Sequence, residues 1–372
     1  MPGKTETSEL KSLTSLRGLA AMAVVLQHFS ATAQDYCRVT IPSLVPHGYV
    51  AVDFFFVLSG FIMAYTYLAS FQQHGLRAYG PFLVKRIARI APLNVVVLII
   101  IALSGELCAL ALGRNIFVAN NYSAYDFVAN LLMLQGIGIG TNLNGPSWSI
   151  SVEFAAYFLF PVFVAAVFGA RTLAWVVVVL ATAGVCGIAL AHPHLAVRVE
   201  GPPGSLVRCF TEFTLGIAAY RLFQSHSAAA FFGRDGVTIG LSLAAAAALA
   251  ARYDLPAVLL FPFIVVAYAV NDGLAARIMQ MRLFYFLGVI SFSLYLLHDP
   301  FRPLELSLLQ ALTPEPVGPV VALTFAFAGA CSVVPFAWLA YFTVERPGRT
   351  FVRTMFSGRT ANPLQPQLDA RP

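Results

Sequence analysis

Long apolar stretches separated by short polar segments recur along the chain. Each apolar stretch is roughly 17 to 25 residues long, which allows a helix to cross about 30 Å of hydrocarbon. We therefore predict an all-α polytopic membrane protein with about ten transmembrane helices. The predicted spans are residues 14–33, 49–69, 90–112, 148–168, 173–191, 205–220, 236–251, 255–271, 283–300 and 318–342.

The composition agrees with this prediction and argues against a soluble globular protein. The chain is 59% hydrophobic and 11% charged, and its mean hydropathy is +0.77. The alternative for the first stretch is a cleavable signal peptide, since Ala31, Thr32 and Ala33 resemble a small-residue cleavage site. The apolar part of a signal peptide is shorter and would not contain Arg17 and His28, so we favour a transmembrane helix.

The distribution of basic residues predicts the orientation of the spans. With ten spans, 17 of the 23 lysines and arginines lie on one side, which the positive-inside rule makes cytoplasmic. If residues 124–140 also crossed the membrane, its two sides would carry 11 and 12 basic residues, which the positive-inside rule disfavours. We therefore expect this stretch to enter the membrane and return to the same side. Gly136, Gly138 and Gly140 favour such a break. Both termini are then cytoplasmic, and helical spans indicate a bacterial inner membrane, because outer-membrane proteins are barrels.

One membrane domain with two polar ends is predicted. Residues 1–12 form a cytoplasmic N-terminus, residues 13–345 the membrane domain, and residues 346–372 a basic cytoplasmic tail that is partly disordered. The five cysteines form neither a CxxC motif nor a Cys/His cluster, so neither a disulfide framework nor a bound metal is expected. The net charge of +6 is accounted for by cytoplasmic loops and requires no nucleic-acid partner.

Arg17 and His28 stand out because they lie within the first predicted span. They are eleven residues apart, so both lie on one helix face, about 16 Å apart along the axis. An ionisable group in a span costs about 2.5 kcal/mol or more and therefore needs a reason to be there. Arg17 could reach lipid phosphates and His28 could bond a neighbouring helix; the alternative for both is a functional site.

A basic cluster lies in KRIARIAP, residues 85–92, at the cytoplasmic end of the third span. Arg86 and Arg89 are three residues apart and share a helix face. With Lys85 and Arg17 they could bind phosphate groups, because guanidinium groups hold phosphate oxygens in a bidentate manner. The alternative is ordinary charge that sets the topology.

Glu153 and Trp148 lie in PSWSISVEF, toward the other side of the membrane. Trp148 suits the membrane interface. Glu153 could orient a histidine or hold a hydroxyl group, and the structural alternative is an ion pair with Arg114 or Arg208.

Three further polar residues lie on that same side. His298 and Asp299 end the ninth span in SFSLYLLHDP, and Asp53 opens the second span. For Asp53 we favour a helix cap or a dipole charge over catalysis. Basic groups on one side and His28 and Glu153 toward the other indicate a ligand that is threaded through the bundle, with its charged head inside.

In combination, these segments resemble a known family. SLRGLAAMAVVLQHF, GYVAVDFFFVLSGFIM, KRIARIAP, SWSISVEFAAYFLFP, LGVISFSLYLLHDP and VERP occur in the order found in the acyltransferase-3 family of integral membrane O-acyltransferases. The resemblance covers about residues 10–350. Its most specific feature is an arginine, ten residues and a histidine in the first span, together with the paired arginines.

The resemblance implies transfer of an acyl group, usually acetyl, from cytoplasmic acyl-CoA to a hydroxyl of a sugar or another acceptor. The matching positions are His28 as catalytic histidine, Arg17, Arg86 and Arg89 as arginines tied to activity and donor binding, Glu153 as motif glutamate, and His298 as a frequent histidine of less defined role. Phe154 departs from the family, where a second acidic residue often follows the glutamate, so we do not expect a carboxylate pair. Many relatives append a periplasmic hydrolase-like domain; without one, a second transfer step is expected to need another protein of glycan biosynthesis.

These roles fit the spacing of the candidate residues. The distance from Arg17 to His28 is of the order of the pantetheine arm of CoA, so the arginines could hold the phosphates while the thioester reaches His28. His28 would accept the proton of the attacking hydroxyl as a general base, and Glu153 would orient the imidazole or stabilise its protonated form. The alternative is an acyl-enzyme on one of Ser147, Ser149, Ser151 or His28.

The expected acceptor is a surface polysaccharide such as exopolysaccharide, a lipid-linked glycan, or a secreted lipo-oligosaccharide such as a nodulation factor. Succinyl or longer acyl groups and a macrolide acceptor are the alternatives within this class of enzyme. A proton-coupled transporter acting through His28, Glu153 and His298 is the alternative of another class. A transporter would be expected to show repeated halves with paired broken helices.

Overall fold

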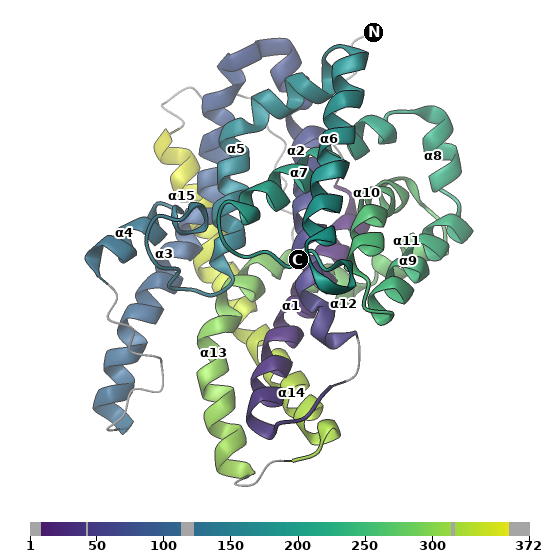
Figure 1. Ribbon diagram of the computed structural model, residues 1–372. Coiled ribbons are helices and arrows are strands. Elements are labelled where there is room, and N and C mark those ends of the chain that lie inside the picture. The colour runs from purple at the N-terminus through teal and green to yellow at the C-terminus, as the bar shows by residue number, and fades with distance from the viewer. Residues whose placement is uncertain (1–8, 42–43, 113–122, 314–316, 357–372) are drawn as a thin grey trace.

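The computed structural model describes residues 9–41, 44–112, 123–313 and 317–356, and every regular element in them is a helix (Figure 1). Residues 1–8 of the predicted N-terminus and the part of the predicted tail after residue 356 lie outside the described residues. The helices of eight or more residues are α1 (Lys11–Cys37), α2 (Ala51–His74), α3 (Tyr79–Leu112), α4 (Ala124–Leu131), α5 (Ser147–Phe168), α6 (Arg171–Leu190), α7 (Gly204–Phe223), α9 (Asp235–Ala250), α10 (Asp254–Val270), α12 (Arg282–Val289), α13 (Ser291–Leu312), α14 (Pro319–Ala340) and α15 (Arg346–Phe356). The shorter ones are α8 (His226–Phe232), α11 (Leu274–Met279), the 3₁₀ helices η1 (Val45–Val50), η2 (Gly75–Ala78), η3 (Gln135–Ile137) and η4 (Pro193–Leu195), and the π-helical turn η5 (Tyr341–Glu345).

Most of the predicted spans fall largely on one helix each, whereas the span predicted at 283–300 is divided between α12 and α13. The count of about ten membrane crossings is not confirmed. Among the described residues, four helical stretches are long and apolar enough to cross: Val45–Ser104, which contains α2 and α3 up to Ser104, Ser147–Phe168, Arg171–Leu190 and Pro319–Phe356. A fifth crossing is possible by length if α12 and α13, which bend by 70°, form one span. The helices α9 and α10 are only 16 and 17 residues long, while α1 and α7 are less apolar because buried polar groups lie within them.

Residues 124–140 do not form a single spanning helix. The helix α4 has eight residues, which corresponds to about 12 Å, and a turn follows it. Gly138 and Gly140 adopt positive φ angles of 92° and 77°, which L-residues rarely adopt. The expected glycine break is therefore present. The loop that follows folds back on α4, where Asp126 accepts a 2.7 Å hydrogen bond from the Thr141 amide.

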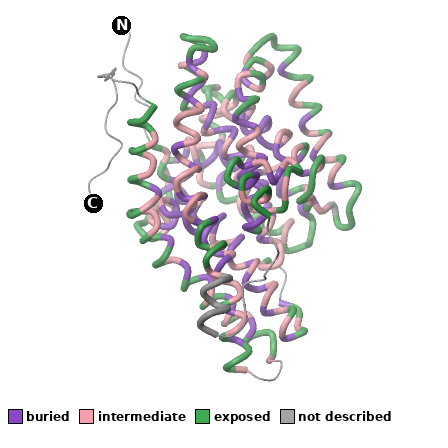
Figure 2. Tube along the Cα trace, turned by 90° about the vertical axis from the view of Figure 1, so that its left-hand side faces the viewer, coloured by how far each residue is buried: buried purple, intermediate pink, exposed green. Residues whose placement is uncertain are grey.

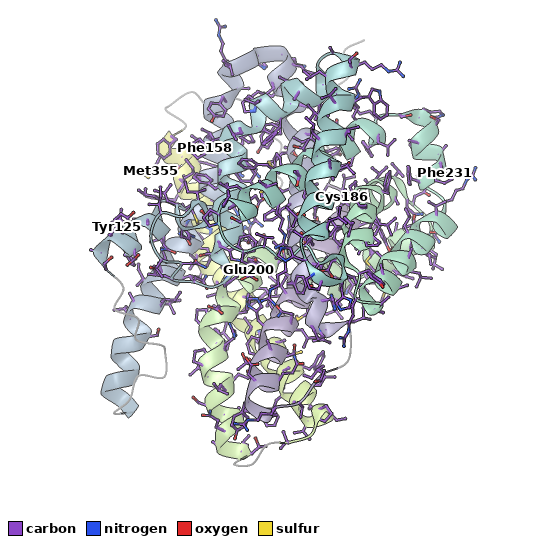
Figure 3. The ribbon with its side chains drawn as sticks, in the orientation of Figure 1. Tyr125, Phe158, Cys186, Glu200, Phe231 and Met355 are labelled. Carbon is purple, nitrogen blue, oxygen red and sulfur yellow. The ribbon has the colours of Figure 1, made fainter. Side chains whose placement is uncertain are left out.

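The outside of the bundle is rich in apolar side chains. Buried residues concentrate in the interior and exposed ones on the periphery (Figure 2). Trp175 and Leu180 of α6 are exposed although they are apolar, and Phe158 and Phe231 likewise lie on the outside (Figure 3). Such a surface suits contact with hydrocarbon rather than with water. The protein is therefore a membrane protein with several apolar helices.

Two pairs of glycines allow helices to pack in close contact near the cavity described below. A Cβ atom at Gly216 of α7 would lie 1.9 Å from the carbonyl oxygen of Val57 in α2, and one at Gly60 of α2 would lie 2.0 Å from a carbonyl oxygen of α7. A Cβ atom at Gly18 of α1 would likewise lie 2.4 Å from the Gly288 nitrogen in α12. Small residues at helix contacts are typical of membrane bundles. They fix α1 against α12, and α2 against α7.

Candidate active site

A cavity of about 170 Å³ lies between α1, α2, α3, α5 and α13. Its wall includes all three arginines that were expected to bind an anionic donor, Arg17, Arg86 and Arg89, as well as Glu153. The remaining polar wall residues include Ser59, Ser149, Tyr157, Ser291 and Tyr295, and much of the rest is apolar. Four candidates that are spread over 137 positions of the chain, from 17 to 153, therefore meet in one place.

Arg17 is held by the start of α13. Its Nε donates to Ser291 Oγ at 2.9 Å, and its Nη2 donates to the Gly288 carbonyl at 2.9 Å. The same carbonyl accepts a 2.8 Å hydrogen bond from Ser291 Oγ. Because Gly18 and Gly288 bring α1 and α12 into contact, the guanidinium reaches these groups directly. Arg17 therefore bonds protein groups rather than extending toward lipid phosphates.

Arg86 and Glu153 are held by tyrosines on the cavity wall. Arg86 Nη2 donates to the Tyr67 hydroxyl at 2.8 Å, and its guanidinium lies 5.2 Å and 5.9 Å from the ring centres of Tyr67 and Tyr157. The Tyr157 hydroxyl donates to Glu153 Oε1 at 2.5 Å. The Nε of Arg86 is buried and has no hydrogen-bond partner among the described residues.

Arg89 pairs with Glu345, a residue whose role the sequence did not reveal. The Oε1 atom of Glu345 accepts hydrogen bonds from both Arg89 and Arg349, and its Oε2 accepts one from Ser293 Oγ at 2.5 Å. Glu345 is only 1% exposed. Glu345 lies in the VERP segment. The only feature of the sequence that pointed to it was its position as a single carboxylate next to the arginines of the tail.

The imidazoles of His28 and His298 form a hydrogen-bonded pair. Nδ1 of His28 lies 3.0 Å from Nε2 of His298, and Nδ1 of His298 lies 2.7 Å from the Tyr295 carbonyl oxygen. The rings meet edge to face at 4.9 Å. The structure thus gives His28 a different partner from the expected Glu153, whose hydrogen bond is to Tyr157.

The hydrogen bonds of this pair assign the positions of the protons. A carbonyl oxygen can only accept, so Nδ1 of His298 carries a proton. In a neutral ring its Nε2 is then an acceptor, and it must receive the Nδ1 proton of His28. Nε2 of a neutral His28 is therefore left without a proton and able to act as a base.

Tyr295 connects the histidine pair to the cavity. It lines the cavity, and its carbonyl oxygen accepts the bond from His298. Its hydroxyl lies 2.8 Å from Ser149 Oγ and donates to the Pro146 carbonyl at 3.3 Å. Neither histidine belongs to the described wall of the cavity. Tyr295 therefore contacts both the cavity and the histidine pair.

Asp53 is part of a buried ion pair. Its two oxygens accept 2.6 Å hydrogen bonds from Nε and Nη2 of Arg208, and both side chains are almost completely buried. Asp53 does lie in the first turn of α2, as a dipole charge would, but its main partner is Arg208. The alternative pairing of Arg208 with Glu153 is therefore wrong, and Arg114 lies outside the described residues.

Trp148 supports this ion pair from the side. The Arg208 guanidinium lies 5.7 Å from the Trp148 ring, which also meets Phe56 edge to face at 6.3 Å. Trp148 is partly buried, so it packs against the core rather than serving only as an interfacial anchor. A cation over an aromatic face is stabilising when it is out of water.

The loop before α5 is attached to α13 next to His298. The Gly145 amide donates to Asp299 Oδ2 at 3.0 Å, and Arg302 donates to Asp299 Oδ1 at 3.0 Å. The Arg302 Nε also donates to Thr32 Oγ1, one turn beyond His28, at 3.1 Å. Asp299 therefore holds this part of the site together.

Fold and site together define a helical membrane protein in which a histidine pair, with His298 buried and His28 partly buried, lies near an arginine-lined cavity. Comparison with known families gives a match to the acyltransferase domain of the acyltransferase-3 family over residues 10–342. The chain therefore belongs to this family and is a membrane O-acyltransferase, which confirms the resemblance seen in the sequence.

Three relatives illustrate the match. Acyltransferase MdmB of Streptomyces mycarofaciens is 28% identical over 323 residues, which cover 78% of each chain. Protein 2 in the picA locus of Rhizobium radiobacter is 32% identical over 187 residues, 46% of this chain and 90% of that protein. Peptidoglycan O-acetyltransferase OatA of Listeria monocytogenes is 23% identical over 161 residues, 41% of this chain and 24% of OatA. No solved structure gives a significant match.

Proposed function

We propose that this O-acyltransferase moves an acetyl group from acetyl-CoA to a sugar hydroxyl of a surface polysaccharide, lipid-linked glycan or lipo-oligosaccharide. The observation that carries this proposal is the arrangement of an arginine-lined cavity, Tyr295 and the His28–His298 pair in series. Transfer of an acyl group from an anionic donor to a hydroxyl requires a positively charged pocket that binds the donor and a general base close to it.

The charge of the cavity supports an anionic donor. Among the described residues, Arg17, Arg86 and Arg89 line it together with one carboxylate, that of Glu153. Phosphate groups on the donor would compensate this charge and receive bidentate hydrogen bonds. Because acyl-CoA is cytoplasmic, the arginine end would face the cytoplasm, both termini would lie there, and the protein would reside in the bacterial inner membrane.

The length of α1 matches such a donor. Arg17 and His28 lie in one continuous helix, so they are about 16 Å apart along its axis. An extended pantetheine arm covers a distance of this order. The thioester would then pass Tyr295 and reach Nε2 of His28, with its head group held by the arginines.

The proposed chemistry uses His28 as general base. The acceptor oxygen attacks the thioester carbonyl while its proton moves to Nε2 of His28. The new imidazolium keeps donating its Nδ1 proton to His298, and that bond becomes charge-assisted and stronger. When the carbon–sulfur bond breaks, the CoA thiolate takes the proton from Nε2. The base is thereby restored.

Direct transfer is favoured over an acyl-enzyme on serine. Ser147, Ser149 and Ser151 each donate to a backbone carbonyl, at 2.8, 3.0 and 2.6 Å respectively. Their hydroxyls are therefore engaged with the backbone and not with His28. Glu153 is proposed to act on the donor rather than on His28: it lies in the cavity wall and holds the hydroxyl of Tyr157 there.

A thioester assay tests this proposal. Membranes containing the protein are incubated with acetyl-CoA and a glycan extract, and free thiol and acetylated glycan are measured together. We expect both products to depend on the protein and to disappear with His28→Ala. Solute uptake that requires no acyl-CoA would instead support the transporter, which family membership already disfavours. Succinyl-CoA and a macrolide acceptor are run in parallel as the alternative substrates.

A further inference from the structure

The carboxylate of Glu345 is shared by two arginines. Arg89 and Arg349 both donate to its Oε1, while Ser293 occupies Oε2. One carboxylate balances only one guanidinium, so a positive charge remains uncompensated at this point. The side chains of Arg89 and Arg349 are only 21% and 23% exposed, where an unbalanced charge is costly.

The π-helical turn η5 creates this arrangement. It covers Tyr341–Glu345, between α14 and α15, and such turns occur frequently at functional sites. Arg349 lies four residues after Glu345 on α15, and α15 packs against α3, the helix of Arg89. The contact is close, since a Cβ atom at Gly348 would lie 2.4 Å from Pro92 of α3. Arg349 is thereby held beside Arg89, one of the arginines that line the cavity.

A second, independent observation is a pair of unused hydrogen-bond donors. The Nε atom of Arg349 is buried and has no partner among the described residues, and the same is true of Nε of Arg86. Buried donors are nearly always satisfied, and leaving one unpaired costs about 1–3 kcal/mol. Each of these donors is therefore available to an acceptor outside the described residues, such as a bound anion.

We infer that Arg349 is a phosphate ligand of the donor, alongside Arg17, Arg86 and Arg89. The inference rests on the proposed function, because it takes the acyl-CoA head group as the source of the phosphates. On binding, a phosphate group accepts from the free Nε of Arg349 and supplies the negative charge that Glu345 alone does not. The anion site then continues from the cavity to the start of α15, where Arg346 and Pro347 are exposed.

Arg353 provides a matched control. It lies one turn beyond Arg349 on α15 and is exposed, so its charge is screened by solvent. Coenzyme A and pantetheine, which lacks the phosphates, are titrated by calorimetry into the full-length protein in lipid nanodiscs. The variants are Arg349→Gln, Arg349→Lys and Arg353→Gln. Arg89 still balances Glu345 in the Arg349 variants, so unfolding temperatures should change little.

We expect Arg349→Gln to weaken coenzyme A binding by about tenfold or more, the loss typical of a hydrogen bond to a charged group. Arg349→Lys should give a smaller loss, and Arg353→Gln a change within about twofold. Pantetheine binding should be the same in all variants. Unchanged coenzyme A binding in Arg349→Gln, or an equal loss for pantetheine, would overturn the inference and assign Arg349 a structural role. If the unmodified protein bound no coenzyme A, the proposed function itself would fail.

Discussion

Replacing His298 by alanine tests whether the histidine pair serves the reaction. The change removes the acceptor of the His28 Nδ1 proton, which now lies 3.0 Å away. Without it, His28 is free to rotate and to take the other tautomer, in which Nε2 carries the proton and is no longer a base. Donor binding should be unaffected, because the arginines are held by groups of α2, α12, α13 and η5.

The size of the effect follows from this one bond. When His28 becomes an imidazolium, its bond to His298 is charge-assisted, and hydrogen bonds to charged groups contribute about 1.5–3 kcal/mol. Since 1.4 kcal/mol corresponds to a factor of ten, kcat should fall by about 10- to 150-fold. The KM for acetyl-CoA should stay the same, because the lost bond strengthens only as the proton moves.

The assay is thiol release with acetyl-CoA at several concentrations, using protein of matched amount and unfolding temperature. His226→Ala is the control, since His226 is exposed on α8, and it should leave both constants unchanged. An unchanged kcat in His298→Ala, or a rise in KM with kcat preserved, would refute the role assigned to the pair.

Two further predictions concern stability. Asp53→Ala leaves Arg208 buried without its carboxylate and should cost about 3–5 kcal/mol of unfolding free energy; Arg208→Met added to it should recover much of the loss in a thermal unfolding measurement, and no recovery would show that the ion pair is not the cause. Hydrogen bonds from the Ser123 side chain, the Thr141 amide and the Ser123 amide lower the pKa of Asp126 from 3.8 to about 2. Because the folded pKa is lowered, this contribution is complete above about pH 4 and is lost as pH falls toward about 2; protection of the Thr141 amide from hydrogen exchange should decline over this range, and an identical decline in Asp126→Asn would contradict the assignment.

The sequence predicted the helices and the arginine cluster because both depend on local spacing. Arg86 and Arg89 are three residues apart on one helix, and apolar stretches mark helices by length. The number of crossings was not predictable with the same certainty. Helix α9 is too short, and helix α1 too polar, to be recognised as a membrane span by length and composition.

Partnerships between distant residues were not visible in the sequence. His298 was recognised as a candidate, but its bond to His28 spans 270 positions and depends on how α13 packs on α1. Asp53 was expected to interact with its own helix, α2. It is bound instead by Arg208 of α7, and glycines bring these two helices together. Glu345 was missed because its partners Arg89 and Ser293 lie 256 and 52 positions away in the sequence. No residue pattern in VERP predicts the π-helical turn that contains it.

Mass spectrometry of the surface and secreted glycans of the host tests the central claim most directly. Four strains are compared: the wild type, a deletion, and the deletion complemented with either the intact gene or a His28→Ala gene at matched protein level. We expect glycans to lose the mass of an acetyl group in the deletion, to regain it with the intact gene, and to remain without it with His28→Ala. Unchanged glycans in the deletion, or full restoration by His28→Ala, would contradict the account.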